Sequence, residues 1–160
     1  MGVSRLIICG GEPTIHPNIT DIISEAKNKK FKVIMITNGF SLGNKYYCNK
    51  IIESGIDTFK FSIHSFKSEI ATTLSGVKGS LKRTLYGIKN CIDNGKVPDI
   101  NMTINKYNID HLKQTIICIN KIFPKIKNFF LQNLDLHIYN DGWEKIFQSS
   151  VPPDILKKYI

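Results

Sequence analysis

The sequence lacks any long run of apolar residues. Although 42% of its 160 residues are hydrophobic and 22% are charged, no stretch approaches the ~18 uninterrupted apolar residues that a membrane-spanning helix needs. Residues 1–5 lead directly into a short apolar run, so the pattern of a secretory signal peptide is missing as well. We therefore expect a globular chain without a membrane partner, located in the cytoplasm.

Closely spaced cysteines are also missing. The chain has four cysteines, at positions 9, 48, 91 and 118, and no two of them have the C-x-x-C spacing of a compact metal or redox site. The spacing equally fails to match a small disulfide scaffold. Each cysteine lies within an apolar strand or helix pattern, so we expect buried, reduced thiols and no metal-ligating residues.

Arginine is scarce, although the chain is basic. There are 22 lysines and arginines against 13 acidic residues, which gives a net charge of +9, and the only arginines are Arg5 and Arg83. A basic balance is typical of proteins that bind nucleic acid or another anion. Here the lysines are scattered over predicted helix faces without interleaved aromatic residues, which argues against a nucleic-acid partner.

Apolar runs and helical periodicities alternate along the chain. The pattern predicts strands at 6–9, 31–36, 57–65, 99–105 and 129–136, each followed by an amphipathic helix, with Pro17 and Ser80 at two of the helix starts. The first strand is continuously apolar, which favours cover on both faces. Residues 66–78 are predicted as a longer connection. This order indicates an α/β fold with a parallel sheet and right-handed crossovers, either open or curled into part of a barrel.

Polar residues follow four successive predicted strands. Because the carboxyl ends of parallel strands share one rim, we expect these residues to lie together. Paired glycines at the first strand end leave the backbone accessible to a ligand. The candidates, in chain order, are Gly10, Gly11, Glu12 and Pro13, then Thr37 and Asn38, then Ser62 and His64, and then Asn105.

The same side chains also fit purely structural roles, in which they do not contact a ligand. Gly-Gly-Glu-Pro makes an ordinary turn, and both Asn38 and Asn105 are turn-forming residues. His64 could donate a hydrogen bond to a neighbouring carbonyl inside a barrel instead of touching a ligand. The residues alone leave these alternatives open.

As a set, the motifs resemble those of the radical S-adenosylmethionine enzymes. Residues 10–17, Gly-Gly-Glu-Pro-Thr-Ile-His-Pro, resemble the motif on the second strand of that family, and residues 37–39 and 61–65 resemble its next two strand ends. Residues 74–81 and 86–90 are similar to a connection and helix found in members that modify peptides or small molecules. The resemblance runs from about residue 6 to residue 135.

The resemblance implies a partial (β/α) barrel with parallel strands, of which this chain holds about five of the six core strands, over residues 1–138. Residues 139–160 would then be a polar connection and the start of a C-terminal helix. The implied cofactor is S-adenosylmethionine, held across the strand ends. By resemblance, its amino group contacts Glu12 and the backbone around Gly10 and Gly11, and Pro13 of the same motif belongs to the binding site. Its carboxylate or ribose contacts Ser62 and His64, its ribose or adenine contacts Asn105, and Thr37 and Asn38 line the floor.

One departure from the family changes the expected function. In the family, a Cys-x3-Cys-x2-Cys motif holds a [4Fe–4S] cluster, and the cluster supplies the electron that cleaves S-adenosylmethionine to a 5′-deoxyadenosyl radical. This motif is missing from these residues. We therefore interpret the sequence as a fragment of a longer enzyme that acts on a peptide or a small molecule. The fragment itself would have no catalytic residues, and the cluster would belong to the intact parent only.

Two other interpretations remain. A non-catalytic α/β binding or scaffold module derived from this fold would keep the barrel wall and would have lost the cluster motif. An unrelated (β/α) enzyme that uses His64 or the carboxylates directly is less well supported, because the sequence offers no paired acid and base at a useful spacing.

Overall fold

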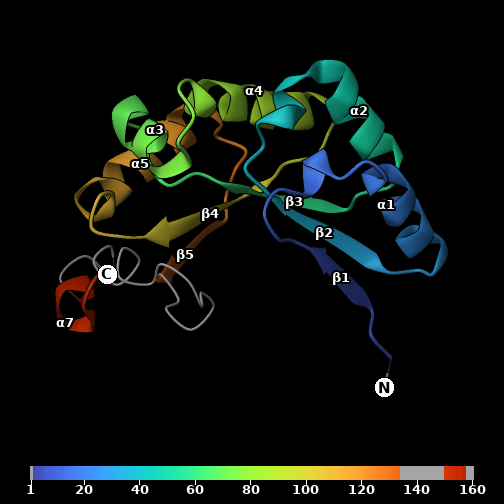
Figure 1. Ribbon diagram of the computed structural model, residues 1–160, viewed down its shortest axis with the longest axis horizontal. Helices are drawn as coiled ribbons and strands as arrows, with labels where there is room; N and C mark the ends of the chain where they lie inside the picture. The colour runs from blue at the N-terminus through green and yellow to red at the C-terminus, as the bar shows by residue number, and fades with distance from the viewer. Residues whose placement is uncertain (1, 134–149, 158–160) are drawn as a thin grey trace.

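Five parallel strands form one curved sheet in the computed structural model, which describes residues 2–133 and 150–157. Neighbouring strands in the sheet are also neighbours along the chain, as Figure 1 shows. The strands are β1 (Arg5–Ile8), β2 (Lys32–Thr37), β3 (Thr58–Ser62), β4 (Asp99–Ile104) and β5 (Phe129–Asn133). This architecture confirms the prediction of an α/β half-barrel. Positions 134–136 of the expected fifth strand and the expected boundary at 138 lie outside the described residues.

Helices connect the strands and cover one face of the sheet (Figure 1). The crossover helices are α1 (Ile19–Asn28), α2 (Lys45–Glu53), α3 (Ser68–Ser75), α4 (Ser80–Asp93) and α5 (Leu112–Ile122). Three short 3-10 helices, η1 (Pro13–Ile15), η2 (Ser41–Gly43) and η3 (Ile109–His111), follow strand ends, and α7 (Pro153–Leu156) lies near the C-terminus. Among residues 2–133 and 150–157, no helix combines the length and the apolar character needed to cross a bilayer.

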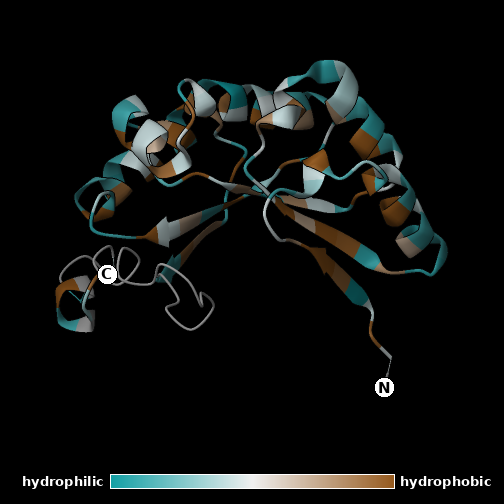
Figure 2. Ribbon diagram, viewed as in Figure 1, coloured by the Kyte–Doolittle hydropathy of each residue, from teal (hydrophilic) through white to brown (hydrophobic). Residues whose placement is uncertain are grey.

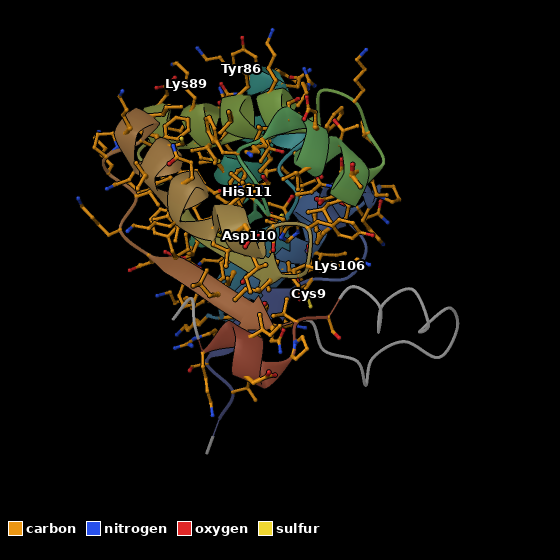
Figure 3. All side chains as sticks on the ribbon, turned by 90° about the vertical axis from the view of Figure 1, so that its left-hand side faces the viewer. Cys9, Tyr86, Lys89, Lys106, Asp110 and His111 are labelled. Carbon is orange, nitrogen blue, oxygen red and sulfur yellow. The ribbon has the colours of Figure 1, made fainter. Side chains whose placement is uncertain are left out.

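The core lies between this helix layer and the sheet. Ile23, Ile51, Ile88 and Ile119 each come from a different helix and are fully buried. They pack with alternate residues of the strands, which point toward the helices because side chains alternate across a strand. In Figure 2 the apolar colour is continuous through β2 and recurs along the neighbouring α1. By contrast, Tyr86 and Lys89 on α4 are exposed and point away from the sheet (Figure 3).

Several local expectations were wrong. The strand β1 is not covered on both faces, since Ile7 is 51% exposed and the strand pairs only with β2 among the described residues. Cys9 follows β1 and is exposed instead of buried, whereas Cys48 and Cys91 are buried as expected. The start of α1 is Ile19, two residues after the predicted Pro17.

The connection between β3 and α4 also differs from its prediction. Residues 68–75 form α3, where the sequence analysis predicts a longer connection and names no helix. The N-cap of α4 is Gly79, with a φ of 78°, so Ser80 is the first helical residue and not the cap. The Ser80 hydroxyl instead lies 2.9 Å from the Ser75 hydroxyl at the end of α3, which joins the two helices across the short turn.

Helix α4 approaches the end of β2 closely because two glycines face each other there. A Cβ atom added to Gly87 would lie 2.6 Å from the carbonyl oxygen of Gly39, and Gly39 itself has a φ of 72°, in the left-handed region. From the same helix, the Thr84 hydroxyl donates to the carbonyl of Asn38 at 2.7 Å. Helix α4 therefore holds the Thr37-Asn38-Gly39 turn in place.

We expect Gly87→Ala to lower the free energy of unfolding by about 1–3 kcal/mol, because the added methyl group forces α4 away from backbone atoms that cannot rotate aside. Urea unfolding followed by circular dichroism measures this change. Lys82→Ala, at an exposed position on the same helix, is the control and should stay within about 0.5 kcal/mol. Equal stability of the Gly87→Ala and Lys82→Ala variants would contradict the close approach.

Candidate functional site

A cavity of about 550 Å³ opens at the carboxyl ends of β1, β2 and β3, which is a suitable size for a cofactor-sized ligand. Seven of the nine residues predicted from the sequence line it. Residues of α3 and α4 complete its wall. The predicted residues in the lining are Gly10, Gly11, Glu12, Thr37, Asn38, Ser62 and His64, and the wall adds Ile15, Phe40, Ala71, Leu74, Val77, Leu81 and Thr84 among others.

The Glu12 carboxylate is the centre of a hydrogen-bond network at the rim. Its Oε1 accepts from the Thr14 N–H at 3.0 Å, from the Thr14 hydroxyl at 2.6 Å and from the Thr37 hydroxyl at 2.6 Å. Its Oε2 accepts from the Asn38 N–H at 2.7 Å. Each carboxylate oxygen offers about two lone-pair sites, so the three donors saturate Oε1, whereas Oε2 keeps one accepting site beyond its bond from Asn38. Glu12 thereby joins the ends of β1 and β2.

The network extends outward from Glu12 in two directions. The Thr37 hydroxyl accepts from the Gly39 N–H at 2.9 Å, which stabilises the turn after β2. On the other side, the Tyr47 hydroxyl donates to the carbonyl of Thr14. Burial, and after it the negative charge of Glu12, raises the pKa of the Tyr47 phenol above its ordinary value of 10.0. Tyr47 therefore stays a neutral donor that anchors η1 to α2.

His64 occupies the place where β3 and β4 separate. The last main-chain bond between the two strands runs from Ile63 N–H to the carbonyl of Asn101 at 3.0 Å. Beyond it, Thr103 N–H donates to the imidazole Nδ1 of His64 at 3.1 Å. Burial lowers the pKa of His64 below its ordinary value of 6.5. The ring is therefore neutral at pH 7 and takes the role of a strand neighbour for β4.

The side chain of Asn105 turns away from the cavity. Its Oδ1 accepts from Tyr107 N–H at 3.0 Å, which is the local bond of an Asx turn. Its backbone N–H donates to Asn108 Oδ1 at 2.8 Å. Pro13 likewise lies outside the cavity lining, buried as the first residue of η1. Seven of the nine predicted residues therefore line the cavity, whereas Asn105 and Pro13 do not.

Sequence reasoning missed several residues that shape the site. Asn108 is fully buried, and its Nδ2 donates at 2.8 Å both to the His64 carbonyl and to the Thr103 carbonyl. Asn108 belongs to the β4–α5 connection, in which Lys106, Asp110 and His111 are labelled in Figure 3. The α3 contribution was missed too, although Ile70, Ala71 and Leu74 have helical spacing and Gly76 supplies a left-handed C-cap with a φ of 69°.

The cysteines do not form a cluster site. Cys9 follows β1, and Cys118 lies on α5. Cys48 on α2 and Cys91 on α4 are neighbours in the core, with their sulfur atoms 3.7 Å apart. Within residues 2–133 and 150–157, no three His, Cys, Asp or Glu side chains gather as a metal site would require. The described residues therefore do not fit an iron–sulfur cluster.

Solved structures share this half-barrel. A crystal structure of Streptococcus suis SuiB bound to S-adenosylmethionine superposes with a TM-score of 0.70 at 23% identity, covering 87% of this chain and 31% of that chain. The native anSMEcpe structure with bound AdoMet and Kp18Cys peptide superposes with a TM-score of 0.75 at 16% identity, covering 97% of this chain and 44% of that chain. At these identities the likeness establishes the fold.

The sequence comparison establishes the family. Residues 1–118 match the model of the radical SAM superfamily, and the chain belongs to this superfamily, as its motifs indicate. Among curated relatives, the probable GTP 3′,8-cyclase of Thermococcus kodakarensis is 31% identical over 106 residues, which are 66% of this chain and 34% of the relative. The chain thus matches about a third of the length of that relative.

We expect Thr37→Val to lower the free energy of unfolding by about 1–3 kcal/mol. The substitution keeps the shape of a buried side chain but removes a hydrogen bond to a charged acceptor and leaves the Gly39 N–H without its partner. Thermal unfolding measures the change. Thr73→Val is the matched control, because its hydroxyl bonds on the exposed face of α3. A Thr37→Val variant as stable as this control would show that Thr37 does not anchor Glu12.

Proposed function

We propose that the cavity at the ends of β1, β2 and β3 binds S-adenosylmethionine, and that the chain supplies one side of a radical SAM active site. The single observation that carries this proposal is the convergence of Gly10, Gly11, Glu12, Ser62 and His64 on one cavity. The family membership supports it, as do the ligands named for SuiB and anSMEcpe.

The chemistry of the lining suits the two ends of this ligand. S-adenosylmethionine carries an ammonium and a sulfonium, both cationic, and Glu12 is the one acidic side chain in the lining. Because the chain saturates Oε1 of Glu12 but gives Oε2 only the Asn38 N–H, Glu12 acts through its charge, through one further hydrogen bond at Oε2 and through the placement of the glycine backbone. A Cβ atom at Gly10 or Gly11 would meet no atom within 4 Å, so the strand end is open to a ligand.

The cavity lining also has apolar side chains. They include Ile15, Phe40, Leu74 and Val77, and such side chains suit the flat faces of an adenine ring. Ser62, a half-buried residue at the end of β3, adds a hydroxyl to the lining. We assign this hydroxyl to the carboxylate or ribose of the ligand, in keeping with the strand-end motif.

The whole protein is proposed to be a longer enzyme in which the cluster ligands lie outside these 160 residues. The scattered cysteines and the one-third coverage of the Thermococcus relative support this view. Its substrate class is proposed to be a small molecule or a peptide, because the relatives include a probable GTP cyclase and a structure with a bound peptide. Without the cluster, these residues alone would cleave no S-adenosylmethionine.

Isothermal titration of the 160-residue chain with S-adenosylmethionine tests the proposal. We expect saturable binding that Ser62→Ala weakens by about 3- to 10-fold, the effect of one lost hydrogen bond. Glu12→Gln should weaken binding further, and circular dichroism must first show that this variant is folded, because the substitution also disturbs the rim. Glu53→Gln, at an exposed position on α2, is the control and should bind like the wild type.

Two results would contradict the proposal. The first is the absence of saturable binding by the folded wild-type chain. The second is binding that neither Ser62→Ala nor Glu12→Gln changes. Translation of the nucleotide sequence upstream of Met1 tests the fragment interpretation separately, since an in-frame Cys-x3-Cys-x2-Cys motif supports the longer enzyme and an immediate stop codon supports the non-catalytic module.

A further inference from the structure

We propose that the inner face of the half-barrel, which is the face of the sheet opposite the helix layer, carries an anion-binding site formed by Lys60 and Asn101. The ligand is a small molecule with a carboxylate or phosphate group, and we assign this molecule to the substrate. The assignment to the substrate rests on the proposed function, whereas the anion site itself stands on the contacts of these two residues.

Lys60 and Asn101 point to the inner face because side chains alternate across a strand. On β3, Lys60 lies between Phe59 and Phe61, which are both buried in the core beneath the helices. On β4, the two neighbours of Asn101 in the sequence are fully buried in the same core. The two residues therefore share one surface, on strands that pair with each other.

The ammonium of Lys60 has an aromatic partner but no ionic one. Its Nζ lies 3.7 Å from the centre of the Phe130 ring on β5, so the half-buried side chain reaches across β4. Asp99 is the register partner of Lys60 on β4, but its carboxylate accepts from Asn128 Nδ2 at 2.9 Å and forms no ion pair with Lys60. An ammonium has three N–H donors, so Lys60 can still donate to an anion.

The side-chain amide of Asn101 is the second polar group of the site. Asn101 is only 8% exposed, and within residues 2–133 and 150–157 its amide has no hydrogen-bond partner. In the same part of the chain, no fully enclosed side-chain nitrogen or oxygen atom lacks a partner, so the unpaired amide must reach the surface of the inner face. Leaving a largely buried amide unpaired costs free energy, which a hydrogen bond to a ligand oxygen would offset.

The proposed anion site adjoins the cavity at the strand ends without being part of it. Ser62 lines that cavity, is the register partner of Asn101, and lies on the same face as Lys60, about 7 Å along β3. Neither Lys60 nor Asn101 lines the cavity. A substrate anchored by its anionic group on the inner face would therefore lie beside the proposed S-adenosylmethionine site.

The charges of the inner face also favour an anion. The five strands contain three cationic side chains, Arg5, Lys32 and Lys60, and a single carboxylate, that of Asp99. Strand alternation places all four on the inner face. A surface with an excess of one charge concentrates ligands of the opposite charge, so the inner face is complementary to a carboxylate or a phosphate.

The site can be tested on the full 160-residue chain by titration with inorganic phosphate and, separately, with malonate, both at constant ionic strength. In ¹H–¹⁵N correlation spectra we expect saturable shifts of the side-chain amide of Asn101 and of the backbone amides of Asn101 and Phe130. The anion that binds more tightly identifies the anionic group of the substrate as a phosphate or a carboxylate.

Variants of the two residues test their roles. Lys60→Met keeps an unbranched apolar side chain but removes the charge, and we expect it to weaken anion binding about 10-fold or more, whereas Lys60→Arg should retain most of the binding. Asn101→Ala should weaken binding by about 3- to 10-fold. Lys82→Met, which removes the same charge from an exposed position on α4, is the control and should bind like the wild type.

Three results would overturn the anion site. The first is the absence of saturable shifts with both anions. The second is a folded Lys60→Met variant that binds like the wild type. The third is equal weakening by Lys60→Met and Lys82→Met, which would show that only the net charge of the chain matters. Melting temperatures close to that of the wild type ensure that a loss of binding does not reflect unfolding.

A parallel titration with S-adenosylmethionine separates this inference from the proposed function. Anion binding without S-adenosylmethionine binding would support the anion site but contradict the proposed function, and with it the assignment to a substrate. S-adenosylmethionine binding without anion binding would overturn the anion site and leave the proposed function intact. When both bind, we expect phosphate to shift the Asn101 amide equally well at saturating S-adenosylmethionine, and competition between the two ligands would overturn the separate site.

Discussion

The rim of this half-barrel depends on the carboxylate of Glu12, which accepts four hydrogen bonds from two separate parts of the chain. Two of its donors come from Thr14, in η1, and two come from Thr37 and Asn38, at the end of β2. Hydrogen bonds to an ionised acceptor are stronger than neutral ones. They fix the relative positions of the first two strand ends before any ligand binds, and so they define the cavity.

The other walls of the cavity are fixed by the same kind of contact. Helix α4 approaches through Gly87 and bonds the Asn38 carbonyl through Thr84, while Asn108 and the His64 ring fill the gap between β3 and β4. These contacts pair most of the polar groups at the rim within the chain, and the lining keeps the charge of Glu12 and the Ser62 hydroxyl for a ligand. A site prearranged in this way loses little freedom when a ligand binds.

The sequence predicted the fold and the placement of most candidate residues at one rim, because both follow from local patterns. Alternating apolar runs and amphipathic periods predict the parallel sheet, and parallel strands bring their carboxyl ends together. The bonds of Glu12 could not be predicted, since Thr37 is 25 positions away and its rotamer depends on packing. Asn105 illustrates a different difficulty, because its strand-end position fits a ligand role and an Asx turn equally well. The helix α3 was missed because its eight residues bury no side chain.

The most direct test of the central claim is to map where S-adenosylmethionine binds. In ¹H–¹⁵N correlation spectra of the chain during titration, the account predicts shifts confined to amides around the rim, those of Gly10, Gly11, Asn38, Ser62 and His64. Amides of exposed residues on the outer helices, such as Lys89, should remain unchanged. Shifts centred on the outer helices, or no shifts at saturating ligand, would contradict the assignment of this cavity.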